Sequence, residues 1–234
     1  MISIIIPAHK EKRNLIQLVG LLKNLENADS SEIIIAQSPD CCDHIASLDN
    51  GTTVHVVKCT RKGRACQMNE AVKHAKGEIV AFLHADVKPP RTFLSDIKKT
   101  LKEEFDAGFF SYKFDKDNFW LGINASFTAK DGLFTGGGDQ CLFIRKSVFT
   151  ELGGFDEKQV LMEDFEFFKR MKQHKVPYRI VKNDLVVSAR KYESNSYLRV
   201  NLSNLLLIIL FKMGYSSEKL KSLHHKLLRT PYNE

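Results

Sequence analysis

The chain has 234 residues and a formal net charge of +7, with 43% hydrophobic and 27% charged residues. A chain of this length buries a sizeable core without disulfide or metal support, and this composition excludes disordered and fibrous proteins. Nine Lys or Arg residues stand against four acidic residues between Lys182 and Glu234, so most of the excess positive charge lies near the C-terminal end. A basic excess fits an anionic partner such as a nucleotide, a nucleic acid or an acidic lipid, without choosing among them.

The five cysteines indicate a reducing compartment. Their number is odd, Cys41 and Cys42 are adjacent, and no Cys-x-x-Cys spacing occurs, which argues against a disulfide framework and against structural zinc. The apolar run Ile2–Ile6 is too short for a signal peptide and is followed by Pro7 and charged residues. We therefore predict a cytoplasmic protein.

The first half of the chain alternates predicted strands with predicted helices. The apolar stripe from Leu15 to Leu25 predicts one helix, and a second is expected over Ala65–Ala75, ended by Gly77. Short apolar runs predict four strands, the first of them stopped by Pro7: Ile2–Ile6, Ile33–Ala36, Val54–Val57 and Ile79–Leu83. This alternation predicts an α/β fold with a mixed, mainly parallel sheet flanked by helices, in which ligands bind beyond the carboxyl ends of the strands.

The second half is expected to share the same core, because no linker separates it from the first. Its expected elements are a strand at Phe105–Phe114, a flexible glycine loop at Thr135–Gly138, a strand at Gln140–Ile144, a helix at Met162–His174 and a two-strand ribbon at Tyr178–Val187.

The C-terminal region carries seven consecutive large apolar residues, Leu205–Phe211, between the cations Arg199 and Lys212. Seven residues cannot cross a bilayer, which requires about 20. We expect a helical segment over Arg199–Arg229 whose apolar face packs on the protein body or in a homodimer, or else lies on a membrane surface.

Two clusters at predicted strand ends suit a nucleotide diphosphate. Pro7, Ala8, His9 and Glu11 follow the first strand, where a loop can hold a base and ribose; a plain turn is the alternative. Lys62-Gly63-Arg64 opens the helix that carries Asn69, and a cation beside a helix N-terminus suits diphosphate; a solvated basic turn is the alternative.

Two further clusters suit metal binding and proton transfer. His84 and Asp86 alternate along an extended chain after a buried strand, so both could face one Mg²⁺ or Mn²⁺ ion; a structural His is the alternative. Glu163 and Asp164 open a predicted helix opposite the Gly136–Asp139 loop, where a carboxylate could act as a general base. Acidic residues that merely favour the helix macrodipole are the alternative.

Taken in order along residues 2–190, these clusters resemble the family 2 glycosyltransferases of the GT-A fold. The resemblance also includes Gly153-Gly154-Phe155-Asp156. The chain is similar, more closely, to a bacterial subgroup associated with arsenosugar biosynthesis. The motifs shared with that subgroup are Gly63-Arg64-Ala65-Cys66-Gln67-Met68-Asn69, Phe82-Leu83-His84-Ala85-Asp86, Gly138-Asp139-Gln140 and Ser188-Ala189-Arg190.

The resemblance implies an inverting transfer of a sugar from a nucleotide diphosphate sugar to an acceptor hydroxyl. Asp86, with His84, would hold the metal, and Asp164 would be the base, with Glu163 as the substitute. The implied nucleotide-binding residues are Pro7, Ala8, His9, Glu11, Gln37, Arg64, Asn69 and Asp86. The implied acceptor-side residues are Gly138, Asp139, Gln140 and Arg190.

Three positions depart from the family pattern. Lys10 stands where many members have Asn, His84 replaces the first Asp of the metal motif, and Gln37 stands where an Asp often reads uracil. A uridine nucleotide is favoured although Gln37 weakens that assignment. We expect a glycosyltransferase domain over residues 1–190, with a nucleotide half to about 104 and an acceptor half beyond it, followed by a basic and apolar helical extension over residues 191–234.

Three other functions compete with this interpretation. A nucleotidyltransferase would need a glycine-rich basic loop after the first strand, which Pro7–Glu11 does not provide. A non-catalytic module that binds a nucleotide sugar or a protein partner would not need Asp86 and Asp164. Nucleic-acid binding lacks a recognisable module, so no nucleic-acid partner is expected.

Overall fold

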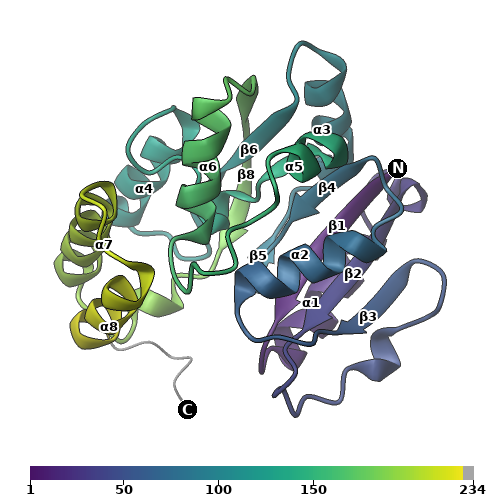
Figure 1. The fold of residues 1–234 in the computed structure, drawn as a ribbon, viewed down its shortest axis with the longest axis horizontal. Helices are drawn as coiled ribbons and strands as arrows, with labels where there is room; N and C mark the ends of the chain where they lie inside the picture. The colour runs from purple at the N-terminus through teal and green to yellow at the C-terminus, as the bar shows by residue number, and fades with distance from the viewer. Residues whose placement is uncertain (229–234) are drawn as a thin grey trace.

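A single eight-stranded sheet draws its strands from both halves of the chain (Figure 1). The structure is a computed structural model that describes residues 1–228. The strand order is β3-β2-β1-β4-β7-β6-β8-β5. The expected mixed sheet with a parallel core is confirmed.

Four parallel strands form one side of the sheet. They are β1 (Ile2–Ala8), β2 (Ser31–Gln37), β3 (Val54–Lys58) and β4 (Ile79–Phe82). Strand β1 is buried along its whole length, because β2 and β4 pair with it on both sides. Pro7 does not end β1 as predicted: the parallel pairing continues through Pro7 to Ala8, opposite Ala36 and Gln37.

The other side of the sheet is mixed. It contains β5 (Val87–Lys88), β6 (Ala107–Phe114), β7 (Phe143–Arg145) and β8 (Tyr178–Val187). Strand β7 is antiparallel to both β4 and β6, whereas β8 runs parallel to β6 and antiparallel to β5. The two-strand ribbon predicted at Tyr178–Val187 is wrong, since this segment is one ten-residue strand whose register with β6 shifts between Phe110 and Tyr112.

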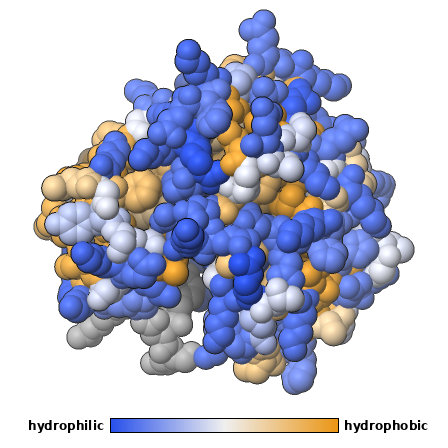
Figure 2. All heavy atoms as spheres, in the orientation of Figure 1, coloured by the Kyte–Doolittle hydropathy of each residue, from blue (hydrophilic) through white to orange (hydrophobic). Residues whose placement is uncertain are grey.

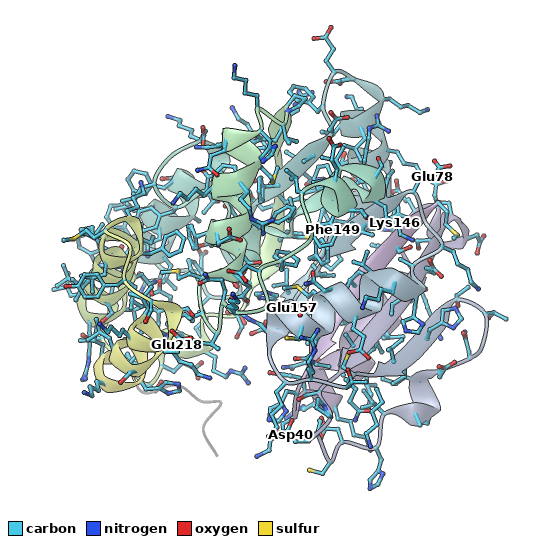
Figure 3. All side chains as sticks on the ribbon, viewed as in Figure 1. Asp40, Glu78, Lys146, Phe149, Glu157 and Glu218 are labelled. Atoms are coloured by element: carbon cyan, nitrogen blue, oxygen red, sulfur yellow. The ribbon has the colours of Figure 1, made fainter. Side chains whose placement is uncertain are left out.

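Helices cover both faces of the sheet. On one face lie α1 (Lys12–Lys23) and α3 (Phe93–Lys102); on the other lie α2 (Arg64–His74), α5 (Lys146–Glu151) and α6 (Glu163–Gln173). The second face is rich in aromatic rings. Phe149, labelled in Figure 3, packs against Phe82, Phe155 and Phe167, with ring centroids 5.0–5.3 Å apart. This cluster fixes α5 and α6 relative to the parallel strands.

Three local predictions need correction. Gly77 does not stop α2, which ends at His74; Gly77 lies so close to β1 that a Cβ there would meet Ser3 Oγ at 2.6 Å. Gln140 lies in a short 3-10 turn, and the strand predicted from it begins only at Phe143. The glycine loop expected to be flexible is buried at Gly136, whose N–H donates to Gln140 Oε1 at 2.9 Å.

Two helices follow the sheet, α7 (Tyr197–Lys212) and α8 (Ser217–Leu227), and they lie together at the left of Figure 1. The predicted helical segment is therefore divided, with Gly214 at φ +85° in the connection, and its last residue, Arg229, lies outside the described residues. Tyr197 Oη donates to Asn124 Oδ1 at 2.8 Å, which ties α7 to α4 (Phe119–Ser126). None of the helices between residues 1 and 228 has both the length and the apolar content needed to span a bilayer.

Candidate active site

The strand ends of β1 and β4 and the start of α2 enclose a cavity of about 220 Å³, which we call the strand-end pocket. Gly63 has φ +108° immediately before α2, a conformation that favours glycine and turns the chain into the helix. The lining residues include seven of those predicted from sequence: Pro7, Ala8, His9, Glu11, Arg64, His84 and Asp86. These residues come from separate segments of the chain and line one cavity.

A second cavity of about 230 Å³, the central pocket, adjoins the first. Both pockets are lined by Arg64 and His84, so these two side chains form their common boundary. The titratable groups that line the central pocket are Arg64, His84, Tyr112, Asp139, Asp164, Lys191 and His224.

Asp164 and Glu163 occupy different environments although they are adjacent. Glu163 is 1% exposed and is held in an ion pair, with Arg64 Nε 2.7 Å from its Oε1. Asp164 lines the central pocket. Burial raises the pKa of Asp164 to about 7, and repulsion from Glu163 adds to this effect. The residue that faces the cavity is therefore a carboxyl group able to accept or release a proton near neutral pH.

His84 connects this acid to the glycine loop. Its Nδ1 lies 3.5 Å from Asp139 Oδ1. Burial and the Arg64 charge lower the pKa of His84, but the hydrogen bond to Asp139 and the Asp139 and Asp164 carboxylates together outweigh them, and the pKa is raised. A Cβ on Gly138 would lie 2.5 Å from His84 Cε1 and 2.6 Å from Asp164 Oδ2. Only a glycine at this position lets the imidazole and the carboxylate approach the loop so closely.

His84 and Asp86, the two residues predicted to share a metal ion, both line the strand-end pocket. Among residues 1–228 no three or more His, Cys, Asp or Glu side chains come together as a metal cage. Burial raises the pKa of Glu11, and the nearby Asp86 carboxylate contributes to that shift. One imidazole and one carboxylate, with a second carboxylate nearby, fit a hard divalent cation only if further oxygen ligands come from a bound diphosphate.

Asn69 and Gln37, predicted to bind the nucleotide, do not line the strand-end pocket, and these two residues and Gln140, predicted on the acceptor side, all have hydrogen-bond partners within the protein. Asn69 lies on α2 and bonds to the loop after α5: its amide donates to Phe155 O at 2.8 Å and accepts from Phe155 N at 2.9 Å. Gln37 donates to Asp43 O at 2.7 Å. Gln140 lines the central pocket but is 1% exposed, and its amide donates to Thr128 O at 3.1 Å.

Arg190 lies apart from the other predicted acceptor-side residues. Its Nη2 is 3.9 Å from Asp86 Oδ2, whereas Gly138 and Asp139 line the central pocket. The next residue, Lys191, does line the central pocket, and its Nζ donates to Asn204 Oδ1 at 3.2 Å. Burial lowers the pKa of this lysine.

The C-terminal helices complete the central pocket, which sequence reasoning did not anticipate. Asn204, Leu207 and Ile208 reach it from α7, and His224 reaches it from α8. Burial lowers the pKa of His224 to about 4, and the Lys191 ammonium contributes, so this imidazole is neutral at physiological pH. The basic character of the region was visible in the sequence, but no motif indicated which side chains turn inward.

Comparison with solved structures identifies the fold as that of the GT-A glycosyltransferases. TarS 1-349 from S. aureus superposes with a TM-score of 0.66 at 15% identity, covering 96% of this chain and 72% of that one. The mannosyltransferase PcManGT from Pyrobaculum calidifontis, in complex with GDP-Man and Mn²⁺, gives a TM-score of 0.66 at 18% identity, covering 96% and 68%. Drosophila β1,4-galactosyltransferase 7 gives 0.52 at 15% identity, covering 76% and 63%.

Curated protein sequences gave no match. The sequence profile described as Glycosyl transferase family 2, in contrast, matches residues 3–160, about two-thirds of the chain. The chain belongs to glycosyltransferase family 2.

Proposed function

We propose that the protein transfers a sugar, with inversion, from a nucleotide diphosphate sugar to an acceptor hydroxyl. The observation that carries the proposal is the meeting of the strand-end and central pockets at Arg64 and His84, with Asp164 in the central pocket only. A donor in the first pocket and an acceptor in the second would meet at this boundary. The TarS structure with UDP-GlcNAc and the PcManGT structure with GDP-Man support a nucleotide sugar as donor.

The strand-end pocket is the proposed donor site, and a uridine diphosphate sugar is the favoured donor. Arg64 places positive charge beside the position of the diphosphate, where it would stabilise the leaving group. Asp86, with His84, would hold Mg²⁺ or Mn²⁺, whose chemistry there is to neutralise the departing diphosphate. The Mn²⁺ in the PcManGT complex supports a divalent cofactor.

In the proposed reaction Asp164 removes the proton from the acceptor hydroxyl. The acceptor oxygen forms a bond to the anomeric carbon as the bond from that carbon to the diphosphate oxygen breaks, and the electron pair leaves with the diphosphate. A base on the side opposite the leaving group gives inversion at that carbon. A pKa of about 7 suits Asp164 to this role, because a general base works best when its pKa lies near the operating pH.

A nucleotide-sugar panel tests the proposal. We expect a uridine diphosphate sugar to raise the unfolding temperature of the protein, and Mn²⁺ to increase that shift, since a ligand that binds only the folded state stabilises it. Asp86→Ala should remove the Mn²⁺-dependent part of the shift. A full panel of nucleotide sugars without any stabilisation would overturn the assignment of the strand-end pocket.

We also propose a peripheral position on the cytoplasmic face of a membrane. One side of α7 exposes Leu198, Leu202, Leu206 and Ile209, and Met213 directly after the helix extends this spacing into a single stripe. The neighbouring α4 exposes Phe119 and Trp120, and Figure 2 shows apolar side chains gathered over these helices. From Tyr197 to Leu228 the chain has five Lys or Arg and one acidic residue, which favours an anionic lipid surface over a second copy of the chain.

A further inference from the structure

An apolar groove of about 450 Å³ lies next to the central pocket, and the two cavities share Phe165 and Ile208. Leu133, Phe168 and Phe211 complete its apolar walls. Phe168 is packed at ring-centroid distances of 5.2 Å from Phe109 and 5.1 Å from Tyr178, so the floor of the groove is held by the sheet. The groove is therefore a continuation of the proposed acceptor site along a rigid surface.

The groove runs along α6 and α7. On both helices the residue numbers increase from the central pocket toward the far end of the groove. Along α6, Asp164 lines the central pocket, Phe168 lines the groove, and Lys172 follows one turn later. Along α7, Asn204 lines the central pocket and Lys212 lines the groove. Eight helical residues rise about 12 Å. The lining thus passes from polar residues in the central pocket, through the apolar Phe168 with Lys169 beside it, to Lys172 and Lys212 at the far end, over about 12 Å.

Three lysines line the groove, namely Lys169, Lys172 and Lys212. Lys172 lies 3.5 Å from Asp131, which partly neutralises it, and its Nζ sits 4.5 Å from the centre of the Phe168 ring. Lys169 and Lys212 are exposed, and among residues 1–228 no acidic side chain lines the groove. The groove therefore combines an apolar interior with a positive potential, which suits an apolar ligand that also carries an anionic group.

We propose that the acceptor is an anionic amphiphile, with its hydroxyl at Asp164, its apolar chain in the groove and its anionic group at the lysines. This inference rests on the proposed function, because it assigns the acceptor hydroxyl to Asp164. It adds the chemical class of the acceptor: a hydroxyl and an anionic group separated by a chain that spans about 12 Å.

Calorimetric titration with ω-hydroxy fatty acids, from hydroxyhexanoate to hydroxyhexadecanoate and below their micelle concentrations, tests the ligand class. We expect one saturable site whose affinity passes through a maximum as chain length grows, since only a chain of the right length joins Asp164 to the lysines. Dodecanediol, which lacks the carboxylate, should bind about tenfold more weakly than hydroxydodecanoate. Equal affinity for the two would overturn the role of the lysines, and absence of binding by every chain would overturn the proposal.

Matched variants on α7 locate the site. Phe211→Asp, on the groove side, should weaken hydroxydodecanoate binding about tenfold or more, while Leu202→Asp, on the outer side of the same helix, should leave it unchanged. If Phe211→Asp does not fold, Leu133→Asp on the opposite wall provides the same test. If hydroxydodecanoate binds the groove variants as well as the parent, or if Leu202→Asp weakens binding as much as Phe211→Asp does, the ligand binds elsewhere and the proposal is overturned.

The nucleotide-sugar shift, measured on the same samples, separates this proposal from the proposed function. A protein that binds the chain in the groove but no nucleotide sugar would not be the proposed transferase. If the protein binds a nucleotide sugar but no ω-hydroxy fatty acid, the donor-site assignment stands and the proposed acceptor class is wrong.

Discussion

At the scale of single residues, Asp164 and Glu163 are adjacent in the sequence but lie in different environments and have different proposed roles. Glu163 is paired with Arg64 out of solvent, whereas Asp164 faces the central pocket. Asp164→Asn should therefore lower kcat by roughly 10²–10⁴-fold, because it removes the proton acceptor in the transition state. Nucleotide-sugar affinity, measured by thermal shift, should not change.

Glu163→Gln is the informative comparison for that variant. This substitution weakens the ion pair that holds Arg64 in place, so it should reduce the affinity for the donor as well as the rate. A fully active Asp164→Asn enzyme together with an inactive Glu163→Gln enzyme would show that the base is Glu163.

The raised pKa of Asp164 should make the protein less stable as the pH rises from about 4 to about 7. Between its ordinary value of 3.8 and about 7, the folded chain keeps a proton that the unfolded chain has released, so the free energy of unfolding falls as pH rises through this range. Asp164→Asn should unfold at a higher temperature than the parent above about pH 7, and at a similar temperature near pH 4. The same ionisation should make the parent's kcat rise with pH and level off above about pH 7.

Gly138→Ala tests whether the glycine loop must lie close to the His84 and Asp164 side chains for activity. The added methyl group would lie 2.5–2.6 Å from atoms of His84 and Asp164, so both must move. We expect kcat to fall while the protein remains folded, since the loop is short and the contact is with side chains. Gly20→Ala, where a Cβ meets nothing within 4 Å, is the matched control and should keep the parent kcat.

Many of the residues that line the strand-end pocket could be predicted from the sequence, because a single rule of sheet geometry places them. Side chains that follow parallel strands meet at one sheet edge, which brings Glu11, Arg64, His84 and Asp86 together. Lys191 and His224 escaped prediction because they enter the pocket from beyond the last strand, where no strand register fixes their direction.

At the scale of elements, Asn69 is the clearest case of a motif residue whose observed role is mechanical. Its two hydrogen bonds to Phe155 join α2 to the loop that precedes α6. Asn69→Ala should lower the free energy of unfolding by about 1–3 kcal/mol, because it leaves buried backbone groups of Phe155 without partners. Urea unfolding measures this loss. Nucleotide-sugar affinity should be retained, and its loss would restore Asn69 to the donor site.

The elements themselves were predicted best where hydrophobic periodicity was strong. The apolar runs of β1 to β4 and the stripe of α1 gave the correct element types. Tyr178–Val187 was misread because its exposed polar positions resemble a turn, whereas pairing with β6 on one side and β5 on the other keeps it a single strand. Membership of the arsenosugar-associated subgroup stays a prediction.

At the scale of the whole molecule, the outer stripe of α7 should bind anionic lipid. We expect the protein to float with phosphatidylglycerol vesicles and not with phosphatidylcholine vesicles, because the segment around the stripe is basic. The double variant Leu198→Glu, Leu202→Glu should stay at the bottom of the gradient. The double variant Ile16→Glu, Leu21→Glu, which places the same charges on exposed positions of α1, should still float.

Sedimentation velocity on the same variants tests the alternative that a second copy of the protein covers the stripe. A dimer that the α7 variant converts to a monomer, without any vesicle binding by the parent, would show that the stripe is a subunit interface instead.

The two cavities draw on different stretches of the chain. Among residues 1–228, those that line the strand-end pocket lie between Pro7 and Asp86, whereas Asn204, Leu207 and Ile208 of α7 and His224 of α8 line one side of the central pocket. Donor choice and acceptor choice can therefore diverge independently in evolution: exchanging the two terminal helices for those of a relative should change which acceptors are accepted while the nucleotide preference is inherited intact.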